Sequence, residues 1–73
     1  PVAADRKGFP DLILVRRKRL IAAELKIKRG GRIKMTPEQW DWLEVLGRAG
    51  AEVYTWTPED FDDIVEVLSD EGG

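Results

Sequence analysis

Apolar residues occur in two short runs near the start of the chain, separated by basic residues. The first run covers residues 12–16 and the second covers residues 20–27. Runs of this length with β-branched residues predict strands. Only residues 17–19 connect them, so an antiparallel hairpin is the simplest arrangement, although the usual Asn-Gly turn pair is absent.

A helix is predicted to begin after Thr36. Thr36 is suited to the N-cap, Pro37 to the first helical position, and Gln39 completes a capping box. The helix is expected to continue to about residue 49, with Gly50 just past its end. Its core-facing residues are predicted to be Trp40, Leu43 and Leu46.

A third strand and a second helix complete the pattern. Residues 52–56 predict the strand, and its connection through the helix favours parallel pairing with the second strand. Thr57 and Pro58 repeat the helix-start pattern. One apolar stripe is then formed by Phe61, Ile64, Val65 and Leu68.

The expected fold is therefore α/β, with the order ββαβα and a mixed sheet flanked by helices. Residues 1–73 would form a single domain, in which residues 1–10 are a loop and residues 69–73 a frayed tail. Small Ala22 and Ala23 in the second strand leave room for a helix to approach the sheet.

Composition restricts the chemistry. A hydrophobic content of 42% with three tryptophans indicates a folded globule, and 73 residues are enough for one small domain. The absence of cysteine and histidine excludes a disulfide framework, a thiolate zinc site, Ser-His catalysis and imidazole ligation of a metal. Catalysis would have to use carboxylates, lysine or metal-activated water.

The sequence contains no run of about 20 apolar residues and no signal-like start, so we expect no membrane partner. Lack of cysteine is compatible with a reducing cytoplasm, which is the expected location. The chain begins with Pro1 rather than Met, and we expect it to be a fragment or a processed product.

Charge is distributed very unevenly along the chain. Residues 1–34 hold eleven basic and three acidic residues, a net charge of +8, whereas residues 35–73 hold one basic and eleven acidic residues, a net charge of −10. The basic half predicts contact with a phosphate backbone. The candidate DNA-binding residues are Arg6, Lys7, Lys28, Arg29, Arg32 and Lys34. Ordinary surface charge, and a frayed terminus at residues 6–7, are the alternatives.

Three charged residues are set into the predicted strands. If the hairpin turn is centred between Arg17 and Lys18, Asp11 lies opposite Glu24, and the two-residue period places Glu24 and Lys26 on one face. Opposed carboxylates are destabilising unless a cation compensates them. Mg²⁺ would do so, with the backbone carbonyl of Leu25 as a further oxygen ligand. The alternative is that these are solvated residues on an exposed strand face.

Ordered motifs along the chain resemble one known family. The strings GFPDLILV, AAELK, TPEQWDWL and AGAEVYTWTPEDFDDIVEVL are similar to the VRR-NUC (virus-type replication-repair nuclease) domain. The compact stand-alone versions carried by bacteriophages are the most similar. These belong to the PD-(D/E)XK nuclease superfamily, and the resemblance extends from Gly8 to Leu68.

The resemblance implies a restriction-endonuclease-like core that hydrolyses phosphodiester bonds in branched DNA, such as flaps or Holliday junctions, as a homodimer. Asp11 and Glu24 would hold Mg²⁺ or Mn²⁺, and Lys26 would orient or help deprotonate the attacking water. Gln39 would support the site, although its capping-box role is sufficient to explain it. The implied setting is a bacterial or phage-infected cell.

The sequence departs from the family pattern at its front. Family members begin with a helix that carries another active-site glutamate, followed by a strand that pairs beside the Pro-Asp strand, and neither precedes residue 10 here. The expected core is therefore truncated. We expect these elements upstream in a longer protein, or a second chain that completes the sheet. The rival hypothesis is a non-catalytic DNA-binding or interaction module.

Overall fold

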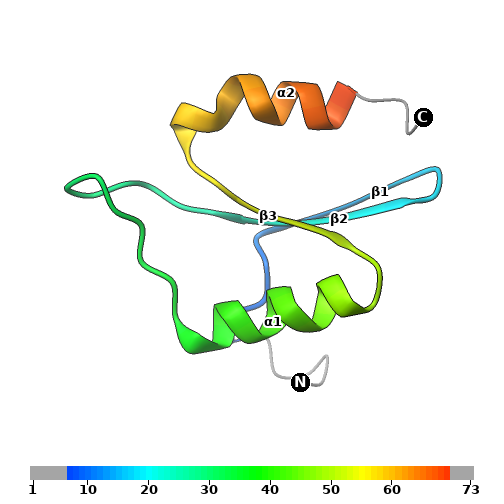
Figure 1. Cartoon of the computed structure of the whole chain (residues 1–73), viewed down its shortest axis with the longest axis horizontal. Coiled ribbons are helices and arrows are strands. Elements are labelled where there is room, and N and C mark those ends of the chain that lie inside the picture. Colours follow the sequence, from blue (N-terminus) through cyan, green and yellow to red (C-terminus); the bar gives the residue numbers. More distant parts are fainter. Residues whose placement is uncertain (1–6, 70–73) are drawn as a thin grey trace.

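The structure is a computed structural model that describes residues 7–69. Its elements follow the order β1 (Leu12–Arg16), β2 (Arg19–Leu25), α1 (Pro37–Arg48), β3 (Glu52–Trp56), a 3₁₀-helix η1 (Pro58–Asp60) and α2 (Phe61–Ser69). The three strands form one sheet with α1 on one face and α2 on the other (Figure 1). The predicted α/β class and the strand and helix order are confirmed.

The sheet is mixed, with β2 in the middle. Strand β1 pairs antiparallel to β2 from Leu12↔Ala23 to Arg16↔Arg19, and β3 pairs parallel to β2 on its other side. The predicted hairpin register and the parallel pairing are both confirmed. Arg17, the first of the two central turn residues, has a φ of 55°, a conformation usually taken by glycine or asparagine. The second strand ends at Leu25, two residues earlier than predicted.

Two layers of apolar side chains hold the helices to the sheet. On the α2 face, the buried residues Ile21, Ala23 and Trp56 form the core with partly buried neighbours from β1 and α2. On the α1 face, Ala22 is fully buried. Gly47 of α1 lies against Val53 of β3, because a Cβ added there would be 3.7 Å from a Val53 methyl group.

Capping fixes the ends of α1 as the sequence predicts. Thr36 Oγ1 accepts from the Gln39 backbone N–H at 3.1 Å, and the Gln39 side chain returns to the Thr36 N–H at 2.9 Å. Gly50 follows the C-cap with a φ of 104°. The helix therefore begins at a defined residue beside the sheet edge.

Two of the predicted apolar faces are partly wrong. In α1, Trp40 is 58% exposed, whereas Trp42 is buried with Leu43. In α2, Phe61 and Val65 are exposed, and Val67 packs on the core in place of them. A 3₁₀ turn at Pro58–Asp60 precedes α2, which itself begins at Phe61. Neither described helix has the length and apolar character needed to cross a membrane.

Candidate active site

The loop before β1 is anchored to α1. Trp42 Nε1 donates to the Lys7 carbonyl at 3.1 Å, and the rings of Phe9 and Trp42 meet edge to face with centroids 4.8 Å apart. Gly8 has a φ of 81° and touches the first turn of α1, where an added Cβ would be 2.5 Å from the Glu38 carbonyl carbon. The sequence analysis missed Trp42, although its place on the helix in a small chain rich in tryptophan is a usable signal.

Asp11 lies immediately before β1, beside the end of β2. Its Oδ2 accepts a hydrogen bond from the Leu25 N–H at 3.0 Å. The β1–β2 pairing ends at Leu12↔Ala23, one position before Asp11 and Glu24, and its register is the one that the sequence predicts. The N–H and C=O of one strand residue point to the same side of the strand, so the Leu25 carbonyl lies on the side of Asp11.

Glu24 is a buried carboxyl group in the middle strand, only 3% exposed. Its Oε1 accepts from Gln39 Nε2 at 3.3 Å, while Oε2 is buried and has no hydrogen-bond partner among residues 7–69. The pKa of Glu24 is raised from 4.5 to about 7. Burial is the largest cause, and the contact with Asp11 and its like charge add to it, whereas the positive charge of Lys26 lowers the pKa. An acid at this position is costly to the fold by itself.

The Gln39 side chain contacts both Lys26 and Glu24. Its Oε1 accepts from Lys26 Nζ at 2.8 Å and from the Thr36 N–H at 2.9 Å, while its Nε2 donates to Glu24. Gln39 Oε1 therefore serves both the capping box and the contact with Lys26, whereas Nε2 contacts Glu24. The four predicted residues Asp11, Glu24, Lys26 and Gln39 lie together at one end of β2.

These residues fit a hard divalent cation. Asp11 and Glu24 supply carboxylate oxygens, the Leu25 carbonyl lies on the same side, and the unpartnered Glu24 Oε2 is a buried acceptor that a cation would satisfy. Within residues 7–69 no group of three or more His, Cys, Asp or Glu side chains gathers to hold a metal. The described site thus offers two carboxylates, as Mg²⁺ often uses when waters and substrate phosphates complete its shell.

The candidate DNA-binding residues fall into two groups. Residues 28–34 form a basic loop that extends from the sheet (Figure 1) and is closed by an Arg29↔Arg32 bridge with N–H to O distances of 2.8 and 3.1 Å. The loop lines a hollow of about 720 Å³ together with residues 25–27, which follow on from β2. Lys7 is exposed beside α1 and pairs with Glu38 at 3.6 Å. Arg6 lies outside the described residues.

Partners differ within the basic loop. Lys28 Nζ lies 3.5 Å from Glu59 Oε2, so an ion pair connects the start of the loop to η1. The side chains of the remaining loop cations form no ion pair with any described acid, and all three are exposed; they are Arg29, Arg32 and Lys34. This loop is therefore the part of the described surface best able to receive phosphate groups.

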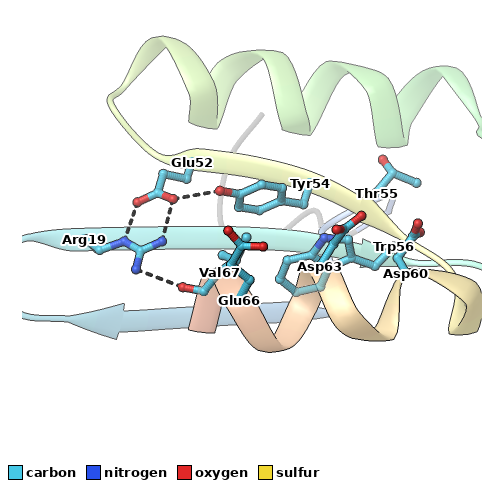
Figure 2. Close-up of a pocket in the computed structure, with 9 residues that line it drawn as sticks. All are labelled: Arg19, Glu52, Tyr54, Thr55, Trp56, Asp60, Asp63, Glu66 and Val67. Atoms are coloured by element: carbon cyan, nitrogen blue, oxygen red, sulfur yellow. Dashed lines mark hydrogen bonds and ion pairs between the residues drawn. The ribbon is translucent and has the colours of Figure 1, made fainter. Parts of the chain in front are cut away.

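A second cavity lies between β3 and α2, on the sheet face opposite Glu24. It has a volume of about 610 Å³ and carries an acidic lining with one arginine (Figure 2). Arg19 holds Glu52 through two hydrogen bonds of 2.7 and 2.8 Å, and Tyr54 donates to Glu52 at 2.8 Å. These contacts lower the pKa of Glu52 to about 2. The negative lining disfavours a phosphate group there. The sequence analysis missed this cluster, because Arg19 was assigned to the turn.

The chain was compared with known proteins in three ways. No family model matches it, and neither the curated proteins nor the solved structures contain a match.

Proposed function

We propose that this chain is the core of a divalent-metal-dependent DNA endonuclease with a truncated restriction-endonuclease-like fold. It would hydrolyse phosphodiester bonds in branched or structured DNA. The single observation that carries the proposal is the buried, unpartnered Glu24 Oε2 beside Asp11 and the Gln39-held Lys26. A buried carboxyl group that faces a second carboxylate is stabilised in its charged form by a cation.

Each residue has a distinct part in the proposed chemistry. Asp11, Glu24 and the Leu25 carbonyl would hold Mg²⁺ or Mn²⁺. A bound ion of this kind supplies an activated water and neutralises charge that develops on the scissile phosphate. Lys26 Nζ would orient that water and exchange its proton, while Gln39 keeps the amine in place through its 2.8 Å hydrogen bond.

The polarity of the surface supports the same substrate. The site lies next to the basic loop, whereas the acidic residues of α2 lie on the opposite face of the sheet. A phosphate backbone following the loop would reach Lys26, which lines the same hollow. The charges would bind DNA without selecting a sequence, because contacts to phosphates carry no base information.

A non-catalytic DNA-binding module is the second candidate. It is favoured by the absence of a third acidic ligand from the described cluster. Both candidates predict binding that weakens with salt, and only the nuclease predicts cleavage.

The test is cleavage of flap, splayed-arm and four-way-junction DNA with Mg²⁺, Mn²⁺ or a chelator. The nuclease requires metal-dependent products that are lost in Lys26→Ala. A thermal melt supplies a readout that needs no activity, because metal should raise the Tm of the wild type but not of Asp11→Asn. Binding without cleavage, and cleavage unaffected by Lys26→Ala, would each remove the nuclease assignment.

A further inference from the structure

An apolar hollow borders the basic loop on another side. Its chemistry differs from that of the basic hollow lined by residues 25–34. It has a volume of about 410 Å³, within the range of ligand pockets. Its walls are mainly apolar and come from the end of β2 and the residues that follow it, from the end of β3, from η1 and from α2. They are formed by Leu25, Lys26, Ile27, Trp56, Thr57, Pro58 and Ile64. The hollow therefore suits a poorly charged group.

The two hollows share one wall. Leu25, Lys26 and Ile27 line both the apolar hollow and the basic hollow of residues 29–34. Leu25 is 49% exposed and Ile27 68% exposed, so this wall presents apolar surface to solvent on a segment adjoining the candidate active site. A ligand that lies across the wall would meet cations on one side and apolar carbon on the other.

Single-stranded nucleic acid has this chemistry, because each nucleotide joins one phosphate to one flat base that is not paired. Arg29, Arg32 and Lys34 have no described acidic partner and can take phosphates. In duplex DNA the bases are stacked inside the helix and cannot enter a side hollow without being flipped.

We infer that the apolar hollow receives an unpaired base of the DNA strand whose phosphates lie along residues 29–34. The inference rests on the proposed function and deepens it, because it assigns a place for single-stranded nucleotides next to the site of cleavage. Trp56 is only 5% exposed, so the base is held by aliphatic walls rather than by stacking on a free aromatic face.

The test is a comparison of affinities in a chelating buffer, which prevents cleavage. The probes are a blunt duplex, the same duplex with a thymidine arm, and the same duplex with an arm of abasic sugar phosphates. The two arms carry equal charge, so their affinity ratio reports base contact alone. We expect the thymidine arm to bind at least about fivefold tighter than the abasic arm, because the base is removed from water against aliphatic walls.

Ile27→Ser is the informative variant, because Ile27 is exposed and lies outside the strands. The affinity ratio should fall towards one in Ile27→Ser. Val15→Ser is the matched control: Val15 is 73% exposed at the far end of the β1–β2 hairpin, and its loss should leave the ratio unchanged.

Each outcome is decisive. A wild-type ratio near one, or an unchanged ratio in Ile27→Ser, overturns the inference while metal-dependent cleavage can still support the proposed function. Failure of all three probes to bind overturns both. A second copy of the chain is the other candidate occupant of the hollow, and sedimentation tests for it. A wild-type dimer that becomes monomeric in Ile27→Ser, with an unchanged affinity ratio, would identify the hollow as an interface between copies and overturn the inference.

Discussion

Gln39 donates through Nε2 to Glu24 Oε1 at 3.3 Å, and this bond joins the first turn of α1 to the buried end of β2. The opposite atom of the same amide, Oε1, holds Lys26 Nζ. Orientation of the acid and the amine is therefore set by one side chain that is itself fixed by the capping box.

Removing Gln39 should damage stability and chemistry together. Gln39→Ala loses half of the capping box, a cost of about 1 kcal/mol in unfolding free energy. It also releases Lys26 and Glu24, so we expect cleavage to fall roughly 10- to 100-fold, as for other residues that position metal ligands. Thermal melts and single-turnover cleavage measure the two effects.

Thr36→Ala separates the effect on stability from the effect on cleavage. It removes the hydroxyl that accepts from the Gln39 N–H, yet it keeps the Thr36 N–H that donates to Gln39 Oε1. We expect a similar stability loss of about 1 kcal/mol with little change in cleavage. Equal loss of cleavage in both variants would mean that Gln39 acts only as a cap.

Glu24 should make the metal-free protein less stable as pH rises. Burial and Asp11 raise its pKa from 4.5 to about 7, so the folded state binds the proton more tightly than the unfolded state. With respect to Glu24, the free energy of unfolding is then greatest below about pH 4.5 and falls between pH 4.5 and 7. Above about pH 7 it stays reduced by the full cost of burying the charged carboxylate. Urea unfolding across this range, in a chelator, measures the trend.

Glu24→Gln is the check on that prediction. Glutamine carries no charge in the buried position, so the variant should be more stable than the wild type at pH 8 without metal and should lose the pH trend assigned to Glu24. It should also lose any stabilisation by Mg²⁺. A variant less stable than the wild type at pH 8 would contradict the burial argument.

Much of this arrangement follows from local sequence rules. The strand register that leads to Asp11 and Glu24 could be predicted because so short a connection leaves few ways to form the hairpin. The helix start at Thr36 and Gln39 follows from capping chemistry that involves only neighbouring residues.

Contacts between distant residues could not be predicted in the same way. The side of α1 that faces the sheet depends on where the loop before β1 docks, and the edge contact of Phe9 with Trp42 selects Trp42 over Trp40. The pairing of Arg19 with Glu52 joins residues 33 positions apart and needs the parallel β2–β3 register. Periodicity contains no information on either contact.

Gly8 should be intolerant of a side chain. At a φ of 81°, Gly8→Ala would meet the Glu38 backbone at 2.5 Å, which adds a clash to the cost of the left-handed conformation. We expect a loss of at least roughly 2 kcal/mol, measured by chemical unfolding, with the loop to Asp11 displaced. Gly30→Ala is the control: it has a φ of 58° in open space, so only the conformational cost of about 1 kcal/mol applies. Equal losses would exclude the close approach of Gly8 to α1.

The Arg19–Glu52 pair should protect the fold against acid. The pKa of Glu52 is lowered to about 2, so this carboxylate contributes stability above about pH 4.5 that is lost as pH falls towards 2. Arg19→Lys keeps the charge but loses the paired hydrogen bonds of 2.7 and 2.8 Å, so its acid-unfolding midpoint should move to higher pH. Circular dichroism during acid titration measures the midpoint. The exposed pair Arg48 and Glu44 offers a control, and an equal effect of Arg48→Lys would contradict the assignment.

The basic loop should determine how DNA binding depends on salt. Each lost phosphate contact lowers the slope of log affinity against log salt by about 0.9 in duplex DNA, so Arg29→Ala with Arg32→Ala should lower it by about 2. The charge-matched control is Lys18→Ala with Arg48→Ala, at the hairpin tip and the end of α1. Because these residues lie away from the hollow of residues 25–34, the control should retain the wild-type slope. Equal slopes in the two double variants would show that net charge, rather than the loop, binds the backbone.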